Sequence, residues 1–272
     1  MESSVIRKPY YNHVRLVLLI EFRFLAKLDQ VKISIIIPTL NEADFIGALI
    51  TKLIEQSGDR EIEIIVADAE SKDGTANLAK AAGAKVIIMS ACCRAKQMNA
   101  GAKIAEGEIL YFVHADLVPP GSFFDDILTA VENGHRYGCY QVTFDRPVPG
   151  LKFNSSLSKY QGIFFRGGDQ TLYMTRDFFD LIGGFDDAIV IMEDYEILLR
   201  ARKHEKIHIM DEKVIISARK METNHYFKTN VINVLVFVLF FLGASQKTLV
   251  NIYQKYVKGA KYKLEENREM PS

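Results

Sequence analysis

The chain has 272 residues, of which 49% are apolar, and it carries 34 basic (Lys and Arg) and 34 acidic (Asp and Glu) side chains. This length and composition predict one large globular unit or a core with an appendage, and they exclude a disordered chain and a small disulfide scaffold. The zero formal net charge argues against a nucleic-acid-binding surface spread over the molecule. Cys92, Cys93 and Cys139 show no metal-ligand spacing and suit reduced thiols, so a cytoplasmic location is expected.

Apolar runs and amphipathic segments alternate through the first half of the chain. Residues 33–37 are apolar and β-branched except for Ser34, which is typical of a strand buried on both faces, and Asn41 is expected to cap the helix that follows. Further strands are predicted at residues 61–66, 85–89 and 108–113, and further helices at residues 75–82, 94–105 and 121–131. Four βα units in this order predict an α/β fold with a doubly wound, mostly parallel sheet flanked by helices.

The pattern is less regular beyond residue 134. Strands are predicted at residues 137–144 and 171–174, followed by a helix at residues 176–182 and another that opens with Glu193 and Asp194. An acidic pair at a helix start has a purely structural explanation, because carboxylates there accept bonds from free N–H groups and oppose the positive end of the helix dipole. That explanation stands beside a catalytic one.

Ligands of open α/β sheets bind where the strands end and the loops begin. Asp116, with His114 two residues before it, follows an apolar strand, and such a carboxylate suits Mg²⁺ or Mn²⁺ that takes its other ligands from phosphates and water. Asp68 ends another strand and is placed to accept a bond from a base or ribose. For each carboxylate the alternative is a simple turn residue.

Arg94 and Gln97 place cationic and amide donors near the start of a predicted helix, where an anion would bind. The alternative is a solvated helix face. The chain contains no GxxxxGK[ST], GxGxxG or GxSxG motif, so P-loop, dinucleotide-binding and serine-hydrolase functions have no support.

Seven short motifs occur in the order seen in family 2 glycosyltransferases of the GT-A fold, which the chain therefore resembles over roughly residues 33 to 217. They are Ser-Ile-Ile-Ile-Pro-Thr-Leu-Asn-Glu from Ser34, Asp-x-x-Ser-x-Asp-Gly-Thr from Asp68, Arg-x-x-Gln-Met-Asn-x-Gly from Arg94, His-Ala-Asp from His114, Gly-Asp-Gln from Gly168, Gly-Gly-Phe from Gly183 and Met-Glu-Asp from Met192. The resemblance is greatest to a bacterial subgroup with His-Ala-Asp in place of the DxD motif.

The resemblance implies inverting transfer of a sugar from a nucleoside diphosphate donor to an acceptor hydroxyl. Asp116, with His114, would bind a divalent cation, and Asp194 of the pair with Glu193 would be the general base. The donor pocket would include the residues Pro38, Thr39, Asn41, Glu42, Asp68, Arg94, Gln97 and Asp169. The loop that holds Asp169 could equally be a flexible connection.

Two other functions remain open. A nucleotidyltransferase has a similar sheet, but it would normally have a Gly-rich basic loop after the first strand, and residues 38–42 contain none. A nucleotide-sugar-binding protein without turnover is the second alternative, because His114 replaces the first acid of the usual metal motif.

The two ends differ from the middle and suggest three regions: an apolar and basic extension at residues 1–31, the transferase domain at residues 32–217 and a hydrophobic helical segment at residues 218–272. Residues 231–244 would form a helix of about 21 Å, short of the ~30 Å membrane core. Lysines follow it with no acid among residues 245 to 263, which suits an anionic membrane surface. The lysines favour a peripheral contact with the inner face of the membrane, with a core helix or a homo-oligomer seam as the alternative. The acceptor is left open, and a lipid-linked acceptor would favour the membrane contact. Natural translation starting near Val31 is a further hypothesis.

Overall fold

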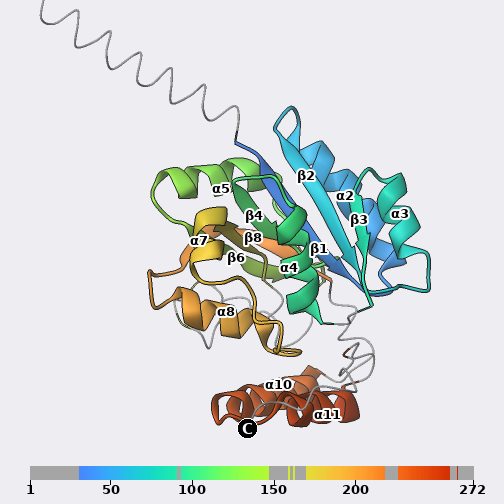
Figure 1. Cartoon of the computed structure of the whole chain (residues 1–272), viewed down its shortest axis with the longest axis vertical. Coiled ribbons are helices and arrows are strands. Elements are labelled where there is room, and N and C mark those ends of the chain that lie inside the picture. The colour runs from blue at the N-terminus through green and yellow to red at the C-terminus, as the bar shows by residue number, and fades with distance from the viewer. Residues whose placement is uncertain are drawn as a thin grey trace, which may run out of the picture.

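One eight-stranded sheet forms the centre of the molecule, with strand order β3-β2-β1-β4-β7-β6-β8-β5 (Figure 1). The computed structural model describes residues 31–90, 93–146, 159, 162, 170–217, 226–257 and 262. The N-terminal extension up to residue 30, Cys92 and the loop residue Asp169 lie outside these described residues.

The first half of the described chain is a parallel α/β unit. Its elements are β1 (Ile33–Thr39), α2 (Ala43–Ser57), β2 (Ile62–Asp68), α3 (Thr75–Ala81), β3 (Lys85–Ile88), α4 (Arg94–Ile104) and β4 (Ile109–Phe112). β1 pairs in parallel with β2 on one side and β4 on the other, and β2 pairs in parallel with β3. The prediction of a doubly wound sheet built from four βα units is confirmed.

The second half extends the sheet with mixed strand directions. Its elements are β5 (Leu117–Val118), α5 (Phe123–Glu132), β6 (Tyr137–Phe144), β7 (Leu172–Thr175), α7 (Arg176–Leu181), α8 (Glu193–Ala201) and β8 (His208–Ile216). β7 runs antiparallel to both β4 and β6, whereas β8 runs parallel to β6. Neither β5 nor β8 was predicted.

Both faces of the sheet are buried, which explains why Ile35, Ile36 and Ile37 of β1 are apolar at consecutive positions. Ile35 and Ile37 face a cluster that includes Leu49 and Leu53 of α2. Ile36 between them faces a second cluster, on the side of α4, α7 and α8. Because successive strand residues point to opposite faces, a run without polar positions requires helices on both sides.

The start of α2 is not capped as predicted. Asn41 has a left-handed backbone (φ 53°), and its side-chain oxygen accepts a bond from the Lys72 backbone N–H instead. The backbone N–H groups of Glu42 and Ala43 donate to Thr75 Oγ1 and Asp73 Oδ2, at 2.9 and 3.0 Å. The caps come from the loop after β2, which lies beside the loop after β1 because the two strands are adjacent.

A pair of helices, α10 (Tyr226–Phe241) and α11 (Gln246–Tyr256), lies outside the sheet on the side of α8 (Figure 1). The helices share a small apolar cluster with the loop before α8, made of Ile191, Ile232, Val236, Leu249, Val250 and Val257. Of the helices in the described part of the chain, none combines the length and apolar character needed to cross a membrane.

Candidate active site

Asp68 and Thr39 are the last residues of β2 and β1 and lie opposite each other in the parallel register. Thr39 Oγ1 donates to Asp68 Oδ2 at 2.8 Å. The Ser71 backbone N–H donates to Oδ1 at 2.8 Å and the Ser71 hydroxyl to Oδ2 at 2.5 Å. Asp68 is almost fully buried, and a buried carboxylate is stable only when bonded in this way. Asp68 thus fixes the loop that follows it at the rim of the sheet.

The two loops after β1 and β2 form one hydrogen-bonded rim. Pro38 is buried within β1, while Asn41 and Glu42 lie in the loop above it. Asn41 N–H donates to Ser71 Oγ at 2.7 Å, which joins the loops at a second point besides the helix caps. The predicted donor-pocket residues Pro38, Thr39, Asn41, Glu42 and Asp68 are therefore brought together at one rim.

Gln97 lies beneath this rim. It is buried in α4, and its Nε2 donates to the carbonyl oxygens of Thr39 and Ala67 at 2.9 and 2.6 Å. Both amide hydrogens are used in this way, so the side chain ties the ends of β1 and β2 together. We infer that Gln97 supports the loops after β1 and β2 and does not bind an anion itself.

A second set of predicted residues meets where α4 and α8 begin. Arg94 is the first residue of α4 and Glu193 the first of α8, and Arg94 Nη1 lies 3.5 Å from Glu193 Oε1. His114 Nε2, just past β4, lies 4.0 Å from Asp194 Oδ2. Residues about 80 to 100 positions apart in sequence thus share one small region.

Electrostatics place Asp116 in the same region. Burial of Arg94 favours its neutral form, but the oxygens of Tyr262, Glu193, Asp194 and Asp116 outweigh this and raise its pKa. Arg94 is therefore a permanent cation among three carboxylates. The neighbouring Cys93 thiol donates to the Ile189 carbonyl at 2.9 Å, and burial raises its pKa, so this thiol is not activated as a nucleophile.

Strained backbone marks the same loops. Among the described residues, the non-glycine residues with positive φ are Asn41 (53°), Glu70 (52°) and Met192 (75°). Each lies within two residues of a predicted site residue: Glu42, Asp68 or Glu193. Left-handed backbone is uncommon for such residues and gathers at functional sites, where the surrounding structure enforces it.

The possible metal ligands in this region suit a divalent cation that takes most of its ligands from the substrate. Within the described residues, no three His, Cys, Asp or Glu side chains form a cluster able to hold a metal ion alone. Mg²⁺ and Mn²⁺ commonly use one or two carboxylates and take further ligands from phosphates and water. Asp116 and Asp194 both act on Arg94, and His114 lies 4.0 Å from Asp194, so this group of residues fits that requirement.

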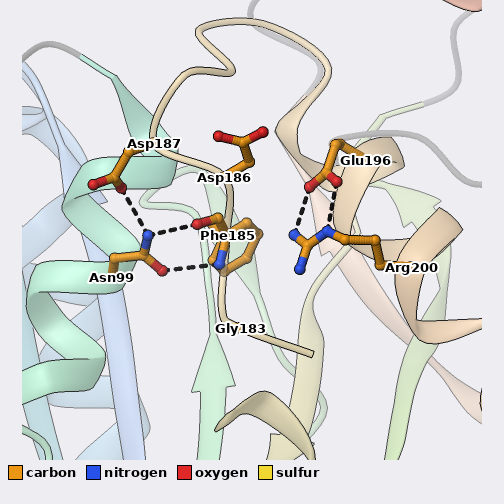
Figure 2. A pocket seen from close by; sticks show the side chains of 7 residues that line it. All are labelled: Asn99, Gly183, Phe185, Asp186, Asp187, Glu196 and Arg200. Carbon is orange, nitrogen blue, oxygen red and sulfur yellow. Dashed lines mark hydrogen bonds and ion pairs between the residues drawn. The ribbon is translucent and has the colours of Figure 1, made fainter. Parts of the chain in front are cut away.

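The glycine and amide residues in the motifs have structural partners that the sequence did not reveal. Asn99 Nδ2 donates to the Phe185 carbonyl and Asp187 Oδ1, each at 2.8 Å, and Asn99 Oδ1 accepts from the Phe185 N–H at 2.9 Å (Figure 2). A Cβ on Gly184 would lie 2.9 Å from Asn99 Oδ1, so glycine is needed for this approach. The motif around Arg94 therefore clamps the loop that leads to α8.

This clamp lines a shallow pocket of about 470 Å³ between α4 and α8. Arg200 in the pocket is bonded to both carboxylate oxygens of Glu196 (Figure 2). It also donates to the Gly184 carbonyl. The polar groups of the pocket are thus largely bonded to one another. The strand-end loops, which carry the predicted site, do not line it.

Comparison with known proteins points to a single family. Residues 34–190 match the model for Glycosyl transferase family 2. Glucosyl-3-phosphoglycerate synthase of Mycolicibacterium smegmatis is 30% identical over 100 residues, which are 34% of this chain and 33% of the synthase. The chain thus matches about a third of the length of that curated relative.

Two solved structures share the fold. S. aureus TarS 1–349 in complex with UDP-GlcNAc has a TM-score of 0.58 at 19% identity, covering 83% of this chain and 71% of the other. Glucosyl-3-phosphoglycerate synthase from Mycobacterium tuberculosis, in complex with Mn²⁺, UDP and phosphoglyceric acid, has a TM-score of 0.52 at 19% identity, covering 71% and 72%. At this identity the likeness establishes the fold.

Proposed function

The chain belongs to glycosyl transferase family 2 and is a glycosyltransferase, and we propose that it moves a sugar from a nucleoside diphosphate to an acceptor hydroxyl with inversion at the anomeric carbon. The observation that carries the proposal is the meeting of Arg94 and His114 with the Glu193–Asp194 pair beside the strand-end rim. The structures of similar proteins hold UDP-GlcNAc in one case and Mn²⁺ with UDP in another. A UDP-sugar is therefore the first donor to test.

The rim after β1 and β2 is assigned to the nucleoside. Asp68 is held rigidly by Thr39 and Ser71. Its Oδ2 already accepts two bonds, whereas Oδ1 accepts one, from the Ser71 N–H, and has a second lone-pair direction. A base or ribose donor can therefore add to the existing bonds. Asn41 and Glu42 complete the edge of this pocket, and Asp169, outside the described residues, stays a proposed member.

The diphosphate is assigned to the region between β4 and the start of α4. Arg94 supplies a permanent positive charge there, and Asp116 with His114 would hold the divalent cation. A divalent cation held there would supply positive charge against the negative charge that develops on the leaving diphosphate. Arg94 acts in the same direction through its own charge.

Asp194 is proposed as the general base. The acceptor oxygen attacks the anomeric carbon, the bond from that carbon to the diphosphate oxygen breaks with its electrons going to the diphosphate, and the acceptor proton passes to an Asp194 oxygen. A single displacement of this kind inverts the configuration. Glu193 pairs with Arg94, so it is better placed to orient the Arg94 guanidinium than to take the acceptor proton.

Two substitutions test the assignment. Asp194→Asn keeps the shape of the side chain but cannot accept a proton, so we expect turnover to fall about 10²–10⁴-fold with donor binding retained. Ligand binding to the folded state raises the melting temperature, so Mn²⁺ should increase the rise in melting temperature that UDP causes in the wild type. Asp116→Ala should abolish this additional rise. Full turnover by Asp194→Asn, with unchanged pH dependence, would remove Asp194 from this role.

The acceptor is proposed to be carried by a lipid. The support is positional: the ring of Tyr195, next to Asp194, lies 5.1 Å from the ring of Phe237 on α10. The helix pair therefore borders the side of the site from which an acceptor would approach. A homo-oligomer through the same helices is the competing arrangement.

A further inference from the structure

One face of α10 carries a row of exposed apolar side chains. Six residues, at offsets of 0, 3, 4, 7, 10 and 11 from Val231, are between 40% and 76% exposed, and we call this row the α10 stripe: Val231, Val234, Leu235, Val238 and Phe241 on the helix and Leu242 directly after its end. Residues at these intervals lie along one side of a helix. The stripe is therefore a continuous surface and not a set of scattered positions.

The opposite face of α10 is also apolar. Ile232 and Val236 are buried against Leu249 and Val250 of α11. A helix on the outside of a protein in water normally has a polar outer face, and contiguous exposed apolar surface marks a contact with a partner or a membrane. The stripe thus calls for an apolar surface to cover it.

The charges around the stripe distinguish between a membrane surface and a second copy of the chain as its partner. Residues 223 to 264 contain six lysines and no Asp or Glu. Lys228 is exposed and continues the stripe by one helical turn, with its Nζ 5.8 Å from the Tyr256 ring, and Lys255 Nζ lies 5.4 Å from the same ring. An apolar row flanked by lysines and a tyrosine matches a helix lying at an anionic membrane surface. A second copy would place like charges against each other.

We propose that the α10 stripe docks on an anionic lipid surface, with the helix axis in the plane of the interface. The helix has 16 residues, about 24 Å, which suits lying in the interface and not spanning the membrane. The consequence for catalysis, which rests on the proposed function, is that Asp194 faces acceptors held at that surface. The ring contact between Phe237, beside the stripe, and Tyr195, beside Asp194, connects α10 to the helix that carries Asp194.

Vesicle sedimentation of the full chain, without nucleotide, tests the docking. The protein should bind vesicles of phosphatidylcholine with 30% phosphatidylglycerol, used as the probe, and bind pure phosphatidylcholine much more weakly. The double variant Val234→Ser, Leu242→Ser should lower the partition coefficient about tenfold or more, since each lost apolar group removes burial in the interface. Leu181→Ser, at a position 56% exposed away from α10, is the matched control and should bind normally.

The charge requirement has its own pair of variants. Lys228→Ser, Lys255→Ser should lower binding to the anionic vesicles about 25-fold, at roughly fivefold per lysine. Lys52→Ser, on the exposed side of α2, is the control. Added salt should weaken wild-type binding, because screening reduces attraction between exposed charges.

Four outcomes would overturn the proposal: no binding of the wild type to anionic vesicles, equal binding to neutral ones, undiminished binding by the stripe variant, or a wild-type dimer in light scattering that the stripe variant converts to monomer. Release of UDP from a UDP-sugar is measured separately in solution. Its retention in a protein that fails to bind vesicles would refute the docking and leave the proposed transferase function intact.

Discussion

Nη1 of Arg94 lies 3.5 Å from Oε1 of Glu193, so the first residue of α4 is paired with the first residue of α8. Within the described residues Glu193 Oε1 has no hydrogen-bond partner, and the residue is only 3% exposed. Its charge is therefore stabilised chiefly by the nearby guanidinium. This pair joins the diphosphate region to the helix that carries the proposed base.

Removing one member of this pair should cost more than removing both. Arg94→Gln leaves a buried carboxylate without its counter-ion, and we expect a loss of about 2 kcal/mol in the free energy of unfolding, reduced from the usual buried-pair value because Arg94 is partly exposed. Adding Glu193→Gln should restore about half of that loss. Urea unfolding of the two single variants and the double variant measures the coupling, and strictly additive losses would contradict it.

Acid should destabilise the protein through Glu63, at the opposite end of the strands. Burial opposes its charged form, but bonds from Ser34 Oγ (2.6 Å) and Lys85 Nζ (2.9 Å), together with the Glu106 N–H, lower its pKa from 4.5 to about 2. A folded pKa below the unfolded one means that this stabilisation is present above pH 4.5 and is lost as the pH falls towards 2.

The contribution of Glu63 is at most about 3 kcal/mol on that shift. Glu63→Gln should lower stability at pH 7 and flatten the decline between pH 4.5 and 2 in urea unfolding. Glu61→Gln, two residues earlier and exposed, is the control and should follow the wild-type curve. A Glu63→Gln curve parallel to the wild type throughout would show that Glu63 is not the group responsible.

Two glycines on helices should respond to alanine in opposite directions. A Cβ on Gly101 of α4 would lie 2.5 Å from Ile36 Cγ2 of β1, so Gly101→Ala should lower stability by about 1–3 kcal/mol. A Cβ on Gly47 of α2 would meet no atom within 4 Å, and Gly47→Ala should raise stability by about 0.5–1 kcal/mol. Melting temperatures measure both effects, and equal shifts would show that the contact of α4 with β1 yields easily.

Gln246 is predicted to position the loop before α8. Its Oε1 accepts bonds from the Val190 and Ile191 backbone N–H groups, each at 3.0 Å, just before Met192 and Glu193. Gln246→Ala should lower kcat severalfold with the donor KM nearly unchanged, because the loop leads to Asp194 and not to the nucleoside rim. Gln246→Glu keeps the acceptor and should retain activity, and Asn251→Ala on the same helix is the control. A change confined to donor KM would refute this role.

The fold was largely predictable because the strands of its parallel half contain apolar runs. The centres of β1 (residues 35–37) and β2 (residues 64–67) are continuous apolar runs because both sheet faces are covered, and the alternating helices follow at regular spacing. β8 escaped prediction because Asp211, Glu212 and Lys213 interrupt it where the register with β6 shifts at Tyr140 and Gln141. β5 has only two residues, too few for any periodicity.

The motifs indicated where the candidate site lies, but they did not reveal which groups each of its residues bonds to. Gln97 and Asn99 bond to backbone groups far away in sequence, at Thr39 and Phe185. Such partners depend on tertiary structure, so a sequence pattern shows the residue type without its contact. The same reason explains why the cap of α2 was wrongly assigned to Asn41.

The exchange of bonds between the loops after β1 and β2 has a consequence for engineering. Because Asp73 and Thr75 hold the first N–H groups of α2, while Asn41 holds the backbone of Lys72, neither loop keeps its conformation without the other. A graft that alters nucleotide preference by transplanting residues 68–75 would have to carry residues 39–43 with it. Shortening residues 68–75 alone would remove the groups that hold the first N–H groups of α2, and shortening residues 39–43 alone would remove the bond that holds the Lys72 backbone.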